Sequence, residues 1–148
     1  MKIHIPLSML ALALAATSAV TAQASNCSNA TIRGSYAYTI HGQVFIPNGP
    51  TLFIDGLART TFDGAGNITE LDAIAVNGNL APGWAPNTGI YSVNPDCTGT
   101  ITVTNGNQPL VHLQMVVAQS GNTIHEMTTD PGFATTAEGE RIKAPQQQ

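Results

Sequence analysis

The feature that most constrains the fold is a succession of short alternating segments separated by turn residues. Within each segment apolar and polar residues alternate with the period of two that a half-buried β-strand requires, and Gly, Pro, Asn or Asp mark the ends. No segment repeats convincingly with the period of an α-helix. About eight strands are therefore expected, with turn signals roughly every 8–14 residues. Their ranges are 32–41, 52–62, 68–76, 89–93, 98–104, 109–119, 122–129 and 133–143.

The short connections between these strands predict how they are arranged. Strands joined by tight turns pair antiparallel, and an up-and-down series of eight has no exposed edges if it closes into a barrel. The sequence thus predicts an all-β protein, a single up-and-down antiparallel β-barrel over residues 25–143, with a β-sandwich as the alternative. The Pro- and Gly-rich segment 77–87 is expected to be a loop. An eight-stranded barrel has room for a packed core or for one small ligand.

The N-terminal segment 1–24 has the three parts of a secretory signal peptide. A lysine precedes an apolar run, and Ala22-Gln23-Ala24 matches an A-x-A cleavage site. The apolar run is short for a transmembrane helix. These features predict a secreted, extracellular protein without stable membrane insertion. The C-terminal segment 144–148 is expected to be a disordered tail.

Export predicts two kinds of covalent modification. In an oxidising compartment Cys27 and Cys97, which are the only cysteines, are expected to form a disulfide. Closing so long a loop is worth roughly 4 kcal/mol in the chain-entropy model. A catalytic thiol is the alternative, although no neighbouring basic residue would lower its pKa. Three sequons make Asn26, Asn29 and Asn67 candidate glycosylation sites if the source is eukaryotic.

The charge balance and the motif search exclude several classes of function. Nine acidic residues stand against few basic ones, so no basic stripe is available to neutralise phosphates and nucleic acid is not an expected partner. The basic residues of the mature chain are Arg33, Arg59, Arg141 and Lys143. The histidines lack metal-ligand spacing, and no phosphate loop or dinucleotide fingerprint is present. Neither a metal nor a cofactor is therefore expected.

Charged residues inside the strand patterns are candidates for a functional site. Asp55 and Arg59 lie four apart on one strand and therefore share a face, together with apolar side chains. Such a pair is either buried or part of a cavity wall. Glu70, Asp72 and Glu126 also share faces with isoleucines, but a solvated outer face is the ordinary interpretation for them.

Three strings of the sequence together resemble a known group of proteins. They are GSYAYTI (34–40), TFDGAGNIT (61–69) and GIYSVNPDCTGTITV (89–103). In combination they resemble a family of small secreted bacterial and fungal proteins that is itself similar to calycin-type barrels, in particular the allene oxide cyclase-like barrels. The resemblance spans most of the mature chain. It implies an antiparallel barrel with an apolar cavity that binds or cyclises a hydrophobic small molecule, and it assigns no catalytic residues.

Two functions from different classes follow. The first is a cofactor-free cyclase or isomerase acting on a polyketide- or terpenoid-like metabolite, in which the cavity orients a flexible substrate. Side chains that could polarise a carbonyl or move a proton are Tyr36, Tyr38, Asp55, Arg59 and His112. The second is a non-catalytic secreted ligand-binding protein or effector. A purely structural surface protein, which needs no cavity, is a third, and the oligomeric state is left open.

Overall fold

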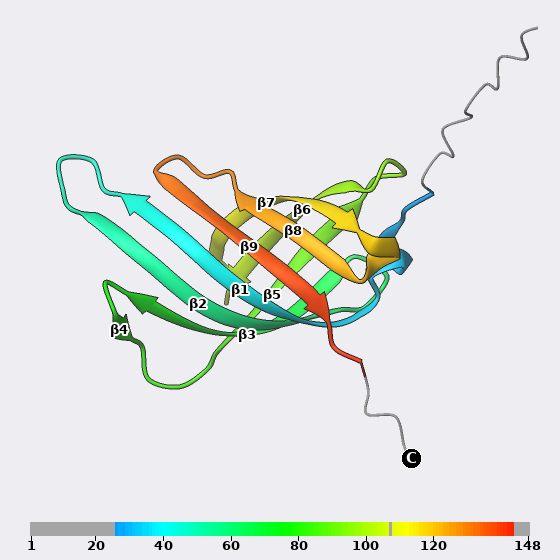
Figure 1. Ribbon diagram of the computed structural model, residues 1–148, viewed down its shortest axis with the longest axis horizontal. Coiled ribbons are helices and arrows are strands. Elements are labelled where there is room, and N and C mark those ends of the chain that lie inside the picture. The colour runs from blue at the N-terminus through cyan, green and yellow to red at the C-terminus, as the bar shows by residue number, and fades with distance from the viewer. Residues whose placement is uncertain (1–25, 107, 144–148) are drawn as a thin grey trace, which may run out of the picture.

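Antiparallel β-strands make up most of the computed structural model, which describes residues 26–106 and 108–143 (Figure 1). The strands are β1 (Gly34–Phe45), β2 (Thr51–Phe62), β3 (Asn67–Val76), β4 (Asn79–Leu80), β5 (Ala85–Val93), β6 (Thr98–Asn105), β7 (Gln108–Ala118), β8 (Thr123–Thr128) and β9 (Phe133–Arg141). Two 3₁₀ helices complete the fold, η1 (Asn29–Ile32) and η2 (Gln119–Gly121). The predicted signal peptide (1–24) and tail (144–148) lie outside the described residues.

The strands close into an up-and-down barrel. Going round the barrel, each strand pairs antiparallel with the next in the sequence apart from the short β4, and β9 pairs with β1. In this closing pair Tyr36 of β1 lies opposite Arg141 of β9. The predicted all-β barrel is confirmed and the sandwich alternative is wrong. Closure follows from the short turns, which keep sequence neighbours adjacent and leave only the first and last strands to find each other.

The strand boundaries differ most from the prediction at two places, and the other strands begin and end within two residues of their predicted bounds. The first strand begins at Gly34, because Ile32 belongs to η1, and it continues to Phe45. The predicted loop 77–87 contains the two-residue strand β4, which pairs with the end of β3, and the first residues of β5. Pro86 is tolerated in β5 near its start, where a missing N–H matters least.

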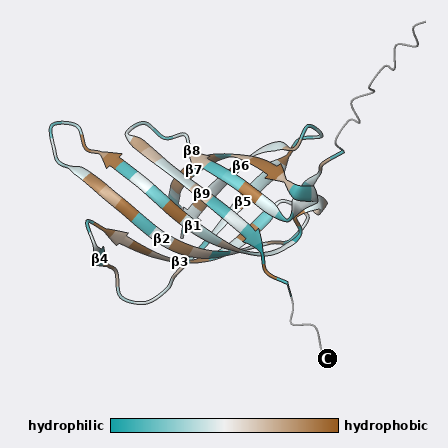
Figure 2. Cartoon of the chain, viewed as in Figure 1, coloured by the Kyte–Doolittle hydropathy of each residue, from teal (hydrophilic) through white to brown (hydrophobic). Residues whose placement is uncertain are grey.

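The two ends of the barrel are built differently. The closed end is formed by η1, η2 and the turns 63–66 and 94–97. The open end carries the turns 46–50 and 129–132, and no helix of the described chain covers it. Figure 1 shows η1 and η2 together at the right and the long β1–β2 turn at the opposite end. Alternating hydropathy is visible as brown and teal bands along β1 (Figure 2).

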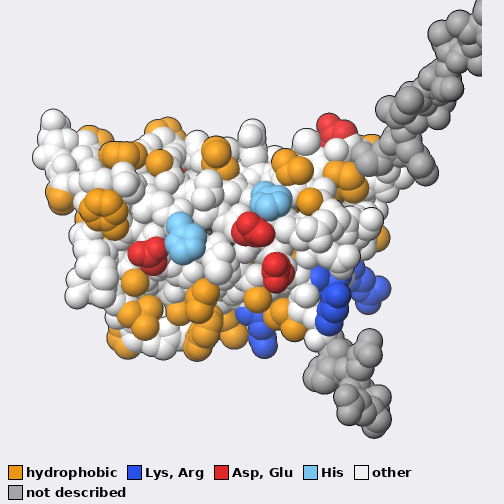
Figure 3. All heavy atoms as spheres, in the orientation of Figure 1, with side chains coloured by type: hydrophobic (Ala, Val, Ile, Leu, Met, Phe, Trp, Pro, Cys, Tyr) orange, Lys and Arg blue, Asp and Glu red, His pale blue; other side chains and the backbone are white. Residues whose placement is uncertain are grey.

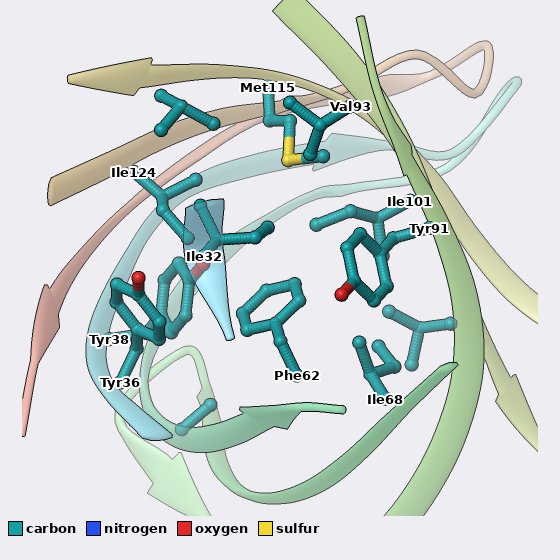
Figure 4. Packing of buried hydrophobic residues seen from close by; sticks show 13 residues of the cluster. Ile32, Tyr36, Tyr38, Phe62, Ile68, Tyr91, Val93, Ile101, Met115 and Ile124 are labelled. Carbon is teal, nitrogen blue, oxygen red and sulfur yellow. The ribbon is translucent and has the colours of Figure 1, made fainter. Parts of the chain in front are cut away.

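The hydrophobic core fills the closed half of the barrel (Figure 4). Three aromatic rings pack edge to face in a row, with centroid distances of 5.4 Å from Tyr36 to Phe62 and 4.9 Å from Phe62 to Tyr91. Ile32 of η1, which is 0% exposed, points into this group and seals the barrel from the end. Burying one such side chain fully is worth about 1.5–3 kcal/mol, so this half carries much of the folding free energy.

Arg141 joins the helices of the closed end to the barrel wall. Its guanidinium donates one hydrogen bond to the carbonyl oxygen of Thr31 at 2.9 Å, two to that of Gly121 at 2.7 and 3.1 Å, and one to that of Arg33. The guanidinium carbon Cζ of Arg141 lies 4.9 Å from the centre of the Tyr36 ring. One planar cation thus ties η1, η2 and β9 together and satisfies carbonyl groups that the short helices leave free.

The predicted disulfide between Cys27 and Cys97 is present, with Cα atoms 5.0 Å apart. Cys97 ends the β5–β6 turn with φ at 68°, the left-handed region. The N-terminal segment is bound to this turn by two further contacts. Cys27 N donates to the carbonyl of Pro95 at 3.2 Å, and Val93 N donates to Asn29 Oδ1 at 2.8 Å. The disulfide therefore holds η1 in place as the cap of the barrel.

Candidate functional site

The open half of the barrel contains a cavity of about 200 Å³. Its walls are mainly aliphatic, with inward side chains that include Ile40, Val44, Ile54, Ile74, Val111 and Leu113. Leu110 and Phe133 also line the cavity and stay 51% and 37% exposed at the open end. The space exists because inward positions that carry Tyr or Phe in the closed half carry smaller residues here, among them Ala58 and Ala137.

Acidic and phenolic side chains converge on this cavity from three strands. Tyr38 comes from β1, Glu70 and Asp72 come from β3, and Glu126 comes from β8. The Tyr38 hydroxyl donates to Glu126 Oε1 at 2.5 Å. Glu126 is only 9% exposed, so its carboxyl group sits in an environment of low polarity. The cavity therefore joins an apolar wall to a small, buried polar region.

Burial changes the protonation of this pair. Desolvation raises the pKa of Glu126 to about 8, although the hydrogen bond from Tyr38 lowers it, and the charge of Glu70 raises it further. Burial, followed by the nearby Glu126, also raises the pKa of Tyr38 well above its ordinary value. Glu126 is consequently mostly protonated at neutral pH and can donate a hydrogen bond, as a neutral carboxylic acid does.

The two carboxyl groups of β3 are held by side-chain amide and hydroxyl groups. Thr60 Oγ1 donates to Glu70 Oε2 at 2.6 Å, and Asn87 Nδ2 donates to Asp72 Oδ2 at 2.9 Å. Asn105 in turn donates to Asn87 Oδ1 at 3.0 Å. Burial raises the pKa of both Glu70 and Asp72. Three carboxyl groups thus face one space whose lining includes no Lys, Arg or His.

The structure separates the five predicted catalytic residues. Tyr38 lines the cavity, whereas Tyr36 lies in the core of the closed end and donates to the carbonyl of Gly121. The two rings are neighbours, with centroids 6.4 Å apart. Asp55, Arg59 and His112 do not line the cavity. A direct part in catalysis therefore stays a prediction for all five, and only Tyr38 stands where a ligand in this cavity would meet it.

The prediction that Asp55 and Arg59 share one face of a strand with apolar side chains is confirmed. The prediction that they are buried or form part of a cavity wall is wrong. Asp55 and Arg59 share the outer surface of β2 with Phe53 and Leu57, which are 56% and 54% exposed. Asp55 accepts a hydrogen bond at 2.9 Å from exposed His41. On a barrel both faces of a strand can carry apolar residues, so apolar neighbours did not identify the inside.

The outer surface also holds other histidines beside carboxylates. His112 Nδ1 lies 2.8 Å from Asp130 Oδ1, and His125 Nδ1 lies 3.8 Å from Glu138 Oε2. Figure 3 shows histidine and acidic side chains gathered on the face over β1, β8 and β9. Among the described residues, no three potential ligands come close enough together to hold a metal ion.

Sequence reasoning missed the three acids that do line the cavity. Glu70, Asp72 and Glu126 were expected on a solvated outer face, and the structure places all three inward. One signal was available, because Glu70 and Asp72 alternate with Ile68 and Ile74 on one face of β3. That face is continuous with the core, since Ile68 is 3% exposed.

Two of the predicted sequon asparagines begin regular elements, Asn29 in η1 and Asn67 in β3. Asn29 Oδ1 accepts a hydrogen bond from Val93 N, and Asn67 Nδ2 donates to Asp63 Oδ2 at 2.6 Å. Glycosylation of Asn26, Asn29 and Asn67 stays a prediction. The disulfide is compatible with an extracellular location. No helix within the described part of the chain has the length and hydrophobicity of a membrane span.

Comparison with known proteins does not assign a function. No family model, curated protein or solved structure matches this chain. The basis for assigning a function is therefore the cavity itself: its volume, its aliphatic wall and the buried group formed by Tyr38, Glu126, Glu70 and Asp72.

Proposed function

We propose that the protein binds a small, largely apolar molecule inside its barrel and acts as a ligand-binding protein or carrier. The observation that carries this proposal is the cavity of about 200 Å³ with aliphatic walls, closed at one end by η1 and η2. Concave, mostly apolar pockets with a few converging polar groups are the usual form of small-molecule sites. The hydrocarbon part of a ligand would contact residues such as Ile40 and Val111, and its polar group would meet Tyr38 and Glu126.

A second function, a cofactor-free isomerase or cyclase, is favoured by the protonation of Glu126. With its pKa raised to about 8, Glu126 is a general acid at neutral pH. In this reaction Glu126 gives its proton to a substrate carbonyl oxygen, and Glu70 as a carboxylate removes a proton from the adjacent carbon. In an unsaturated ketone the resulting dienol takes the proton back from Glu70 at a different carbon and returns its hydroxyl proton to Glu126, so the double bond has moved and both carboxyl groups are restored. For ring closure the enol carbon attacks a second carbonyl carbon of the substrate, the enol hydroxyl proton returns to Glu126, and Glu70 protonates the new alkoxide. The resemblance to cyclase-like barrels points to the same chemistry.

Native mass spectrometry of the protein purified from its own host tests the binding function. A bound apolar molecule should appear as a mass difference that disappears on denaturation. In the variant Val111→Trp, whose larger side chain would occupy the cavity, the molecule should be missing. Thr100→Leu, an exposed position on the outside of β6, is the matched control and should keep it. Retention of the molecule by Val111→Trp would place it outside the barrel and contradict the proposal.

The variant Glu126→Gln separates the two functions once a ligand is identified. Glutamine keeps the shape of the side chain and can still accept the hydrogen bond from Tyr38. A carrier should show no conversion of the ligand in either protein. An enzyme should convert the ligand, and Glu126→Gln should reduce the rate by roughly 10²–10⁴-fold, the usual contribution of a general acid.

A further inference from the structure

The polar region of the cavity lacks a positive charge. Its titratable groups are Tyr38 from β1, Glu70 and Asp72 from β3, and Glu126 from β8. The residues that β2, β6, β7 and β9 contribute to the lining are all uncharged. Buried carboxyl groups are normally paired with a cation or bind one, because an isolated charge is costly in an apolar environment.

We infer, on the basis of the proposed ligand-binding function, that the ligand is a small apolar amine whose protonated nitrogen binds between Glu126 and the carboxyl groups of β3. Such a ligand supplies the charge that the barrel wall does not. Its ammonium group offers up to three N–H donors, and bonds between an ammonium and a carboxylate are about twice as strong as neutral ones. Its hydrocarbon part matches the aliphatic wall.

The geometry of Glu126 supports this assignment independently of charge. Among the described residues its side chain is hydrogen-bonded through Oε1 alone, to Tyr38. The second oxygen, Oε2, has no hydrogen-bond partner among them, and the residue that carries it lines the cavity and is only 9% exposed. Tyr38 fixes the direction of the carboxyl group, so Oε2 is an oriented acceptor for a donor brought in by the ligand.

The same arrangement discriminates against other ligands. A carboxylate ligand would place a further negative charge beside three acids, which is unfavourable at short distance. A neutral alcohol could take one hydrogen bond, but it would leave the carboxyl groups without a counter-charge. A protonated amine gains most, because it forms an ion pair with Glu126 once that carboxyl group has given up its proton.

Calorimetry with three matched series of compounds tests the inference. The probes are the linear alkyl amines, alcohols and carboxylates from four to eight carbons, titrated at pH 7 into the full oxidised protein. The best amine should bind at least about tenfold more tightly than the alcohol of equal length, and the carboxylate should bind weakest.

The number of protons released on binding is a second readout of the same titrations. In two buffers of different ionisation enthalpy, the amine should release close to one proton and the alcohol none. Amine affinity should rise between pH 6 and 9 as Glu126, with its pKa of about 8, becomes ionised.

Variants locate the effect in the cavity. Glu126→Gln and Glu70→Gln together should weaken amine binding far more than alcohol binding, and should bring the preference for the amine over the alcohol of equal length below about threefold. Glu138→Gln makes the same chemical change on the outer surface and should alter nothing. Preference that persists in the double variant would place the amine at outer carboxylates and overturn the inference.

The outcomes also separate this inference from the proposed function. Equal binding of amine and alcohol, with both blocked by Val111→Trp, overturns the amine assignment and leaves the ligand-binding function standing. Failure of every probe in all three series overturns the ligand-binding function, and the amine assignment with it.

Discussion

The two halves of the barrel share one architecture but use opposite interiors. In the closed half the inward residues are bulky and fully packed, as Tyr36, Phe62 and Tyr91 show. In the open half smaller aliphatic residues surround a cavity of about 200 Å³, and carboxyl groups replace apolar ones on β3 and β8. The closed half also carries the disulfide and the Arg141 contacts.

This difference shows how stability and function are divided along one barrel. Aromatic packing and cross-links in the closed half stabilise the fold, whereas the buried acids of the open half lower stability when they ionise. Strained or destabilising features are commonly kept where a protein binds or reacts. The four predictions below test the division, beginning with the largest expected effect.

The first prediction concerns pH. The pKa of Glu126 is about 8 in the folded protein against an ordinary value of 4.5, so the folded state keeps an extra proton between these values. The free energy of unfolding should therefore be highest near pH 4.5 and fall as the pH rises through 8, by on the order of 5 kcal/mol. Urea unfolding between pH 4.5 and 9 measures this change in the free energy of unfolding. Glu126→Gln should remove most of the dependence of the free energy of unfolding on pH.

Asp63, an exposed acid in a turn, should change the free energy of unfolding with pH in the opposite direction, and it serves as the control. The hydrogen bonds from Asn67 and the turn backbone lower the pKa of Asp63 to about 2, so its contribution is lost as the pH falls from about 4 toward 2. Asp63→Asn should therefore affect stability only above that range and by a constant amount. A slope between pH 5 and 8 that is undiminished in Glu126→Gln would contradict the assignment to Glu126.

The second prediction compares aromatic residues from the two halves. Phe62→Ala should lower the free energy of unfolding by about 3–5 kcal/mol, because the ring is 1% exposed and contacts two other rings. Phe133→Ala, at the open end and 37% exposed, should lower it by about 1 kcal/mol. Chemical denaturation measures both. Equal effects would show that the open end is packed as tightly as the closed end.

The third prediction removes the covalent link. Replacing Cys27 and Cys97 together by serine should lower the free energy of unfolding by about 3–4 kcal/mol, because the disulfide closes a loop with a sequence separation of 70. Ligand affinity should change little, since neither residue lines the cavity. A large loss of affinity in the folded variant would mean that η1 controls the shape of the open half as well.

The fourth prediction concerns Arg141. Arg141→Gln should lower the free energy of unfolding by about 2 kcal/mol, because carbonyl oxygens of Thr31, Arg33 and Gly121 lose a charged donor. Arg59→Gln, an exposed change on the outside of β2, should stay within about 0.5 kcal/mol. Thermal unfolding of the two variants side by side is sufficient. Equal effects would show that the Arg141 contacts add nothing to the closed end.

Much of the fold could be predicted because its determinants are local. The alternation in β6, with Thr residues on one face and Ile101 and Val103 on the other, defines a strand without any partner. The turn Asp63 to Asn67 is likewise encoded by its own side chains, since Asp63 Oδ1 accepts from the backbone of Ala65, Gly66 and Asn67. The boundary of β1 could not be read in the same way, because its last residues pair with both β2 and β9.

The candidate site could be predicted only in part. Tyr38 was among the side chains expected to polarise a carbonyl or move a proton, and it lines the cavity. Glu126 and Glu70 were not, because a lone carboxylate on a strand is usually solvated. Their inward position depends on which face of each strand the barrel encloses.

By itself the sequence determined the strands, the turns and the pairing of the two cysteines, since each follows from neighbouring residues or from the absence of another partner. Tertiary structure alone decided which of two similar faces became the inside. Asp55 and Arg59 lie outside with exposed Phe53 and Leu57, while Glu70 and Asp72 lie inside with Ile74. Alternation fixes which side chains share a face, but only closure of the sheet, which buries one face of every strand at once, selects the face that is withdrawn from water.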